Sequence, residues 1–216
     1  MAKEGIPFLL ASLVLVVFAY LVKPIAALPF FLFFLFVAYF FRDPKRISPE
    51  DEQLLLSPAD GKVVESQEVN DPRFFEGPAN KIAIFMSPLD VHVNRAPTNG
   101  RVEKVEYKPG KYMMAWDEKA SDANERNAVF FVTNQGSKIT FVQIAGFLAR
   151  RIICDVKRGS VLKKGQRFGI IRFGSRVDVY LPLDLEVQVQ VGDRLKAGES
   201  VIAKFPRPHK EGLFLR

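Results

Sequence analysis

Three short segments contain residue types that could together carry out nucleophilic chemistry. A serine follows a glycine at Gly174-Ser175, a histidine lies between two valines at His92, and an aspartate precedes a glycine at Asp60. A serine hydroxyl becomes a nucleophile when a neutral histidine removes its proton, and a carboxylate can hold that histidine in the required tautomer. These residue types could therefore supply a nucleophile, a base and the carboxylate that orients the base.

Each segment alone also has an ordinary structural interpretation. An Asp-Gly pair soon after Pro58 is typical of a turn. A histidine between two valines on a strand is typical of a packed structural residue, and Gly174 is typical of a bend between two strands. The chemical interpretation therefore depends on the three segments occurring together.

The combination resembles the phosphatidylserine decarboxylases, specifically the short form found in archaea and many bacteria. The resemblance runs from about Leu54 to the C-terminus, and the order and spacing of the motifs match. The motifs are Ser57-Pro58-Ala59-Asp60-Gly61, Phe85-Met86-Ser87-Pro88-Leu89-Asp90-Val91-His92-Val93-Asn94-Arg95 and Phe168-Gly169-Ile170-Ile171-Arg172-Phe173-Gly174-Ser175-Arg176. The long bacterial form has Leu-Gly-Ser-Thr at the last of these, so the role of Arg176 stays undefined.

The resemblance implies a proenzyme that cuts itself between Gly174 and Ser175. Asp60, His92 and Ser175 would form the triad, leaving a β chain of residues 1–174 and an α chain of residues 175–216. Ser175 would become a covalent pyruvoyl group, whose carbonyl takes the substrate amine and acts as an electron sink. The enzyme would convert phosphatidylserine to phosphatidylethanolamine, with His92 also protonating the carbanion. Archaetidylserine is an alternative substrate, and the residues that bind the substrate are not identified.

The first 46 residues are predicted to be a membrane anchor. Ile6 to Val22 and Pro24 to Phe41 are two uncharged apolar runs separated by Lys23. Each is near the lower limit of about 17 to 25 residues for a spanning helix. Pro29 favours a late start of the second helix, so a spanning hairpin and a hairpin that dips into one leaflet both fit. The second run argues against a cleaved signal peptide.

The charges that flank the anchor predict its orientation. Arg42, Lys45 and Arg46 follow the second run directly, and Lys3 precedes the first. By the positive-inside tendency these residues place the following domain, residues 47–216, in the cytoplasm. A cell-membrane enzyme with a cytoplasmic catalytic domain is the resulting expectation.

The domain after the anchor is predicted to be mainly β, an α+β chain with a sandwich- or barrel-like catalytic unit. Short apolar runs alternate with turn residues, and residues 111–127 are polar and irregular. Alternating apolar residues give Arg176–Leu181 and Leu185–Val191 the pattern of half-buried strands. An exposed sheet edge would favour a homodimer. The other expected strands are Lys62–Glu65, Lys81–Met86, Arg101–Tyr107, Ala128–Thr133 and Lys138–Ile144.

One short pattern occurs twice. Gly159-Ser-Val-Leu-Lys-Lys-Gly165 is followed 33 residues later by Gly192-Asp-Arg-Leu-Lys-Ala-Gly198. Biotinyl- and lipoyl-carrier modules mark their turns similarly, although two unrelated turns would look the same. A membrane-anchored, lipoyl-like adaptor without catalytic activity is therefore the main non-enzymatic alternative. Such adaptors carry long helical hairpins in addition and lie on the far side of the membrane, which the sequence does not favour.

Composition limits the other functions. The net charge of +7 fits a solvated basic face or attraction to anionic lipid headgroups, and no nucleic-acid motif is present. A single cysteine, Cys154, allows no intrachain disulfide. His92 and His209 are the two histidines, without a ligand cluster, so no metal is expected. Arg150 and Arg151 could hold a phosphate or a carboxylate, although a basic pair is also typical of a solvated surface.

Overall fold

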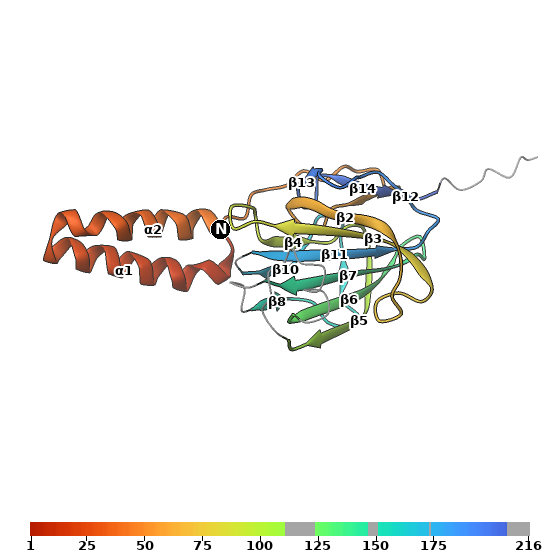
Figure 1. Cartoon of the computed structure of the whole chain (residues 1–216), viewed down its shortest axis with the longest axis horizontal. Coiled ribbons are helices and arrows are strands. Elements are labelled where there is room, and N and C mark those ends of the chain that lie inside the picture. Colours follow the sequence, from red (N-terminus) through yellow and green to blue (C-terminus); the bar gives the residue numbers. More distant parts are fainter. Residues whose placement is uncertain (111–123, 147–150, 173, 207–216) are drawn as a thin grey trace, which may run out of the picture.

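A computed structural model describes residues 1–110, 124–146, 151–172 and 174–206 of the 216-residue chain. A helical hairpin projects from one end of a β-rich domain, which is a curled sheet with smaller sheets beside it (Figure 1). The predicted fold class is thus confirmed. His209 and Arg150 lie outside the described residues, as does most of the 111–127 segment; Arg126 and Asn127 begin a strand.

The hairpin consists of α1 (Ile6–Val22) and α2 (Ala27–Phe40), introduced by the short 3-10 helices η1 (Lys3–Gly5) and η2 (Pro24–Ala26). The bounds of α1 coincide with the first apolar run. The second helix begins at Ala27, two residues before the predicted start, because a proline in the first helical turn displaces no intrahelical hydrogen bond. Lys3–Val22 forms one 20-residue helical stretch of mean hydropathy 2.5, long and apolar enough to cross a membrane.

The strands of the domain form three sheets. The large sheet has the order β13-β2-β3-β11-β7-β6-β5-β9, and the small sheets have the orders β1-β14-β12 and β4-β10-β8. All the pairings are antiparallel. The strands are β1 Leu54–Leu56, β2 Gly61–Asn70, β3 Pro78–Met86, β4 Val93–Arg95, β5 Gly100–Lys108, β6 Arg126–Thr133, β7 Lys138–Ala145, β8 Ile152–Cys154, β9 Val161–Leu162, β10 Arg167–Ile171, β11 Ser175–Leu181, β12 Glu186–Val187, β13 Arg194–Leu195 and β14 Val201–Lys204.

Six of the predicted strands are present, but the seventh is much shorter. Within Leu185–Val191 only Glu186–Val187 pair with another strand. The alternation there still has a structural cause, because Leu185 is buried and Val187 and Val189 pack against the core. A period-two pattern reports which side chains face inward, and it does not require a hydrogen-bonded partner along the whole segment.

The central strand β11 is buried on both faces, whereas the sequence pattern predicted a half-buried strand. All seven of its residues are buried. Val177, Val179 and Leu181 face the main core. On the opposite face the guanidinium of Arg176 donates to Asp178 and, over 2.9 Å, to Glu65 of β2. Lys81 of β3 also pairs with Glu65, so a buried ionic network covers the face that was expected to be solvated.

The repeated glycine pattern occupies equivalent places at the two ends of the large sheet. Leu162 of β9 lies opposite Gly100, the first residue of β5, and Leu195 of β13 lies opposite Gly61, the first residue of β2. The sheet curls so that the two repeats meet: a Cβ on Gly198 would lie 3.4 Å from the Cα of Gly165. The two turns therefore have the same structural role, at opposite edges of one sheet.

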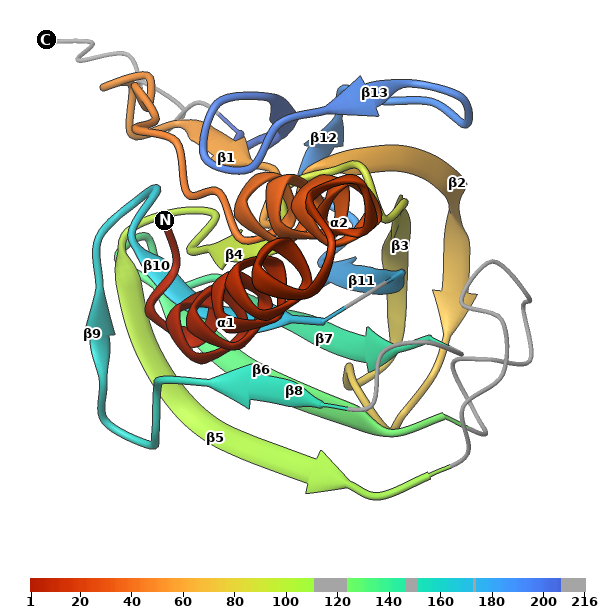
Figure 2. The same ribbon diagram turned by 90° about the vertical axis from the view of Figure 1, so that its left-hand side faces the viewer.

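The base of the hairpin packs on the domain as part of a separate apolar cluster. This cluster joins the two ends of the hairpin to the residues around β4 and β10, and Figure 2 shows both helices projecting from that end of the domain. Beyond the cluster most large side chains of the hairpin are exposed, as expected of a membrane-associated element. The buried residues of the cluster are Ala2, Val37, Phe40, Phe41, Val91, Val93 and Ile170.

Candidate active site

Sheet register brings the sequence-predicted Ser175 and His92 together at the hairpin end of the domain. Ser175 begins β11 and lies between Met86, at the end of β3, and Ala145, at the end of β7. His92 immediately precedes β4, and its carbonyl accepts a hydrogen bond from the amide of Ile171, at the end of β10. Segments far apart in the sequence thus end at one edge, directly beneath α1 and α2 (Figure 2).

His92 is held as a neutral imidazole with a defined tautomer. Its Nδ1 lies 3.0 Å from the carbonyl oxygen of Asp90, and its Nε2 lies 3.3 Å from the amide nitrogen of Gly174. Since a carbonyl only accepts and an amide N–H only donates, the proton is on Nδ1 and Nε2 carries the lone pair. Burial lowers the pKa of His92 to about 4. A base is therefore directed at the predicted cleavage site.

The Gly174-Ser175 bond has the local geometry that the predicted cleavage needs. Gly174 has φ +59°, a left-handed conformation that other residues adopt at a cost of about 1–2 kcal/mol. Ser175 is fully buried, and its hydroxyl lies 3.4 Å from the sulfur of Met86. This weak contact leaves the hydroxyl free to turn without breaking a strong hydrogen bond. A buried serine beside a neutral histidine fits the formation of a pyruvoyl group at this position.

Phe40, the last residue of α2, covers His92. The centroids of the two rings are 4.3 Å apart, and both side chains are 0% exposed. The next residues reinforce this contact, because Arg42 donates to the carbonyl of Leu89 over 2.7 Å, in the segment that leads to His92. Sequence analysis placed Phe40 only within an apolar run. The anchor is therefore also a wall of the candidate active site.

Replacing Phe40 with alanine should change the pH dependence of self-cleavage. Removing the ring admits water to His92, so its pKa should rise from about 4 toward its ordinary value of 6.5. The base must be neutral, so the cleavage rate of the variant should fall between pH 7 and pH 5, where the parent rate stays constant. Cleavage rates followed by intact mass across this range test the effect. Phe33→Ala, an exposed position on α2, is the control, and a parent-like profile for Phe40→Ala would contradict the assignment.

Asp60, the third predicted site residue, is bound to other groups in this structure. Both carboxylate oxygens accept from Nη2 of Arg46, at 2.9 and 2.7 Å, and one also accepts from the Ala197 amide. Burial raises the pKa of the Asp60 carboxyl, while the Ala197 amide and Arg46 oppose that rise. The carbonyl of Asp90 holds His92 Nδ1, the position that a triad aspartate would occupy. Arg46, which the sequence offered only as a flanking charge, thus connects the end of the anchor to Asp60.

The Asp60–Arg46 pair should behave as one unit. Removing either partner leaves a largely buried charge uncompensated, so Asp60→Asn and Arg46→Met should each destabilise the protein by about 3 kcal/mol. The double variant should be no less stable than either single variant. Urea unfolding of the three variants measures the coupling, and their cleavage rates should all fall by about tenfold. A loss of about 10⁴-fold in cleavage for Asp60→Asn alone, with Arg46→Met unaffected, would instead indicate a direct triad contact.

A chain of buried amides leads to Ser175 from the core side. Asn127 donates to Gln143 over 3.1 Å, and Gln143 donates to Asn94 over 2.8 Å. The Asn94 amide then points at the sulfur of Met86, which contacts Ser175. Polar side chains in an apolar core are costly unless they are bonded, so this chain fixes Met86 and the start of β11. In the sequence, only its position two residues after His92 associates Asn94 with the candidate site.

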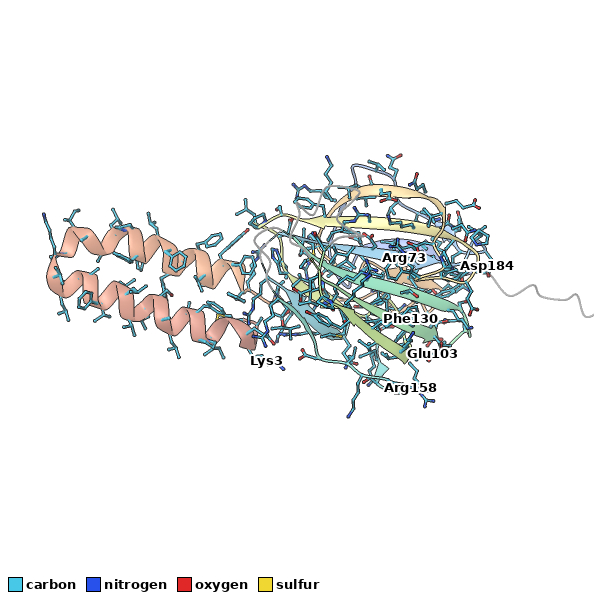
Figure 3. The ribbon with its side chains drawn as sticks, turned by 60° about the horizontal axis from the view of Figure 1, so that its bottom comes forward. Lys3, Arg73, Glu103, Phe130, Arg158 and Asp184 are labelled. Atoms are coloured by element: carbon cyan, nitrogen blue, oxygen red, sulfur yellow. The ribbon has the colours of Figure 1, made fainter. Side chains whose placement is uncertain are left out.

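The site is closed in the uncut chain. His92 and Ser175 are both 0% exposed. A hollow of about 340 Å³ does exist on the domain surface, but it lies over the opposite face of the large sheet, among Arg73, Glu103 and Phe130 (Figure 3). Its lining contains none of Asp60, His92 and Ser175. His92 and Ser175 are therefore both shielded from solvent in the uncut chain.

Comparison with known proteins identifies the family. The phosphatidylserine decarboxylase family profile matches residues 33–203. The phosphatidylserine decarboxylase proenzyme of Syntrophus aciditrophicus is 46% identical over 207 residues, covering 94% of this chain and 97% of that protein. The proenzyme of Carboxydothermus hydrogenoformans is 48% identical over 205 residues, covering 94% and 96%. This chain is a member of the phosphatidylserine decarboxylase family. Its place in the short, archaeal-type form stays a prediction.

Proposed function

We propose that this chain cuts itself between Gly174 and Ser175, and that Ser175 becomes the pyruvoyl group of a phosphatidylserine decarboxylase. Members of this family are pyruvoyl-dependent carboxy-lyases made as proenzymes, which gives the activity of the chain. The proposed position of the cleavage is supported by His92. Its Nε2, which carries the lone pair, lies 3.3 Å from the amide nitrogen of Gly174, just before β11. The proposed domains are an anchor of residues 1–46 and a catalytic domain of residues 47–216.

The cleavage step uses Ser175 as the nucleophile and His92 as the base. The Ser175 hydroxyl leaves Met86, gives its proton to His92 Nε2 and attacks the Gly174 carbonyl. The Gly174–Ser175 amide bond breaks as an ester bond forms, and His92 returns the proton to the nitrogen. Removal of the Cα proton of Ser175 then expels the Gly174 carboxylate. The dehydroalanine that is left takes up water and releases ammonia, which gives the pyruvoyl group.

The chain's own residues prepare the decarboxylation. A pyruvoyl group supplies an electrophilic carbonyl for the substrate amine and an electron sink for the bond to the carboxylate. His92 lies beside this position, and its Nε2 would take a proton from the substrate ammonium and return it to the substrate carbon that has lost its carboxylate. The network of Arg176 and Asp178 with Glu65 joins the new α chain to the β chain. This network keeps the first residues of the α chain in register after the backbone is cut.

The location proposed for the catalytic domain is the cytoplasmic face of the cell membrane. The apolar hairpin supports membrane association, and Lys3, Arg42, Lys45 and Arg46 support the side. Arg42 and Arg46 also form hydrogen bonds within the protein, so they contribute both to the proposed orientation and to the packing of the hairpin end on the domain. A protease added outside spheroplasts should therefore leave the domain intact. A homodimer is also proposed, through an edge strand such as β8, and light scattering of the detergent-solubilised protein tests it.

The proposed activity is tested by carbon dioxide release from phosphatidylserine labelled in its carboxyl group. Phosphatidylethanolamine should appear in equal amount, and only with protein that has been cleaved. Archaetidylserine, which has the same headgroup, is the alternative substrate and should be assayed in parallel. A cleaved protein that releases no carbon dioxide from either lipid would contradict the proposed function. A lipoyl-like adaptor, the alternative that family membership disfavours, would show neither cleavage nor release.

A further inference from the structure

Arg172 and Arg151 lie beside the candidate active site, and neither forms an ion pair with a carboxylate of the described residues. Arg172 follows β10, and its amide nitrogen lies 3.4 Å from the carbonyl oxygen of Arg151 on the neighbouring strand end. Within the described parts of the chain, no carboxylate is in ion-pair distance of either guanidinium. Glu4, an acidic residue in the surroundings, is engaged with Arg167 over 2.7 Å. Glu4 favours the charged form of Arg172, but burial and the charge of Arg151 outweigh it, so the site has room for a further anion.

Residues on both sides of Arg172 in the sequence form hydrogen bonds with His92. The residue before Arg172, Ile171, donates its amide to the His92 carbonyl, and the residue two after it, Gly174, donates to His92 Nε2. Arg172 therefore directly follows one residue that is bonded to the proposed base. It is also only three residues from Ser175 in the sequence. An anion bound by Arg172 would be held by a residue three positions before the reacting serine.

The depth of Arg172 relative to the anchor matches that of a lipid headgroup. Its guanidinium lies over the ring of Phe8 in the first turn of α1, 5.0 Å from the ring centroid. Past this turn α1 presents exposed apolar side chains, whereas Lys3 marks the junction with the domain on the other side (Figure 3). Lipid phosphates lie at such a boundary between hydrocarbon and water. A guanidinium at this distance from an aromatic ring is attracted to the face of the ring, which favours its position at this depth.

Arg172 also has unused hydrogen-bonding capacity. Its Nε is buried and has no hydrogen-bond partner. Burial and the charge of Arg151 lower the pKa of the Arg172 side chain, although it stays protonated at neutral pH. A bound anion would offset both the cost of burying the guanidinium and its repulsion by Arg151. An arginine fork fits the paired oxygens of a phosphodiester, and the exposed Arg151 can close on the same group.

We propose that Arg172 and Arg151 form the binding site for the phosphodiester of the lipid substrate. The inference rests on the proposed function and deepens it, since it assigns the part of the substrate that sequence analysis left without a binding residue. In phosphatidylserine the phosphorus lies about 5 Å from the amine nitrogen. A phosphate on Arg172 therefore brings the amine to the neighbourhood of residue 175. The site selects serine lipids over free serine, because free serine has no phosphodiester.

The test compares two substrates that differ in the phosphodiester. Phosphatidylserine and an O-alkylserine, a serine ether lipid without phosphate, are each presented at equal surface fraction in phosphatidylcholine vesicles. For Arg172→Gln, kcat/KM per cleaved chain should fall about 10- to 100-fold with phosphatidylserine, the range for losing a charge-assisted hydrogen bond. It should change less than about twofold with O-alkylserine. Arg151→Gln should act in the same direction with a smaller loss.

Controls separate this site from general effects of charge. Arg158→Gln removes the same charge from an exposed turn away from the hairpin (Figure 3) and should leave both substrates unaffected. Equal losses with both substrates would overturn the proposal, because they would indicate a structural role or binding of surrounding anionic lipid. Unchanged kinetics with phosphatidylserine would overturn it as well. If Arg172→Gln does not cleave itself, the same comparison of the two substrates is made with Arg172→Lys and Arg151→Gln. A loss with phosphatidylserine alone supports the proposal, and equal losses overturn it. Absence of cleavage in the parent protein would contradict the proposed function itself.

Discussion

Ser175→Ala will leave the protein as one uncut chain with no decarboxylase activity. Alanine has no hydroxyl to attack the Gly174 carbonyl, and no other group can be converted to a pyruvoyl at that position. The fold should be retained, since the hydroxyl makes only a 3.4 Å contact with the sulfur of Met86. The expected loss of activity is complete, because the prosthetic group itself is missing. Intact mass and carbon dioxide release from phosphatidylserine measure the two effects.

The matched control for this variant is Ser66→Ala. Ser66 is a half-buried serine on β2, whose hydroxyl donates to the Val189 carbonyl over 3.4 Å. It should cleave and decarboxylate like the parent. If the Ser175→Ala protein still produces two fragments, the cleavage site must lie at another peptide bond. The catalytic assignment of Ser175 would then be wrong, whatever the family of the chain.

His92→Gln will slow self-cleavage by at least about 10²- to 10⁴-fold, the usual contribution of a general base. Glutamine can still accept the Gly174 amide through its side-chain oxygen, so the loss reports the missing base more than a missing contact. The remaining chain should accumulate uncut. Any fraction that does cleave should decarboxylate slowly as well, because His92 is also the proposed proton donor. A single-turnover time course, followed by intact mass, separates the two steps.

The pH dependence of self-cleavage in the parent protein tests the same assignment. With a pKa of about 4, His92 is neutral from pH 5 to pH 8, so the cleavage rate should be constant across this range. The rate should fall only as the pH approaches 4, when the imidazole becomes protonated. A midpoint near 6.5 in the parent would mean that His92 is not desolvated as the structure describes. Normal cleavage and decarboxylation by His92→Gln would exclude both of its proposed roles.

The sequence predicted the elements and the reacting pair because these depend on local patterns. Helix α1 coincides with an uncharged run, and β11 coincides with the alternation after Ser175. The motif order identified His92 and Ser175, and sheet register explains why they meet. The exposure of β11 was predicted wrongly, because Glu65 and Lys81 come from distant strands and pair with charges that locally look solvated.

Other parts of the candidate site could not be predicted because they depend on contacts between distant segments. Phe40 is one of many phenylalanines in an apolar run, and nothing local distinguishes the one that packs on His92. Arg46 follows the anchor as an ordinary flanking charge, yet it binds Asp60. Arg172 lies within a motif, but its contacts with the ring of Phe8 and the carbonyl of Arg151 come from other segments of the chain. Tertiary placement, more than residue type, gives these residues their roles.

Intact mass of the purified protein under denaturing conditions tests the central claim most directly. The account predicts two fragments, residues 1–174 and a smaller one derived from residues 175–216. The smaller fragment should resist N-terminal sequencing and be lighter by one ammonia than a chain that starts with serine. A single uncut chain after prolonged incubation, indistinguishable from Ser175→Ala, would contradict the claim that this protein makes its own prosthetic group.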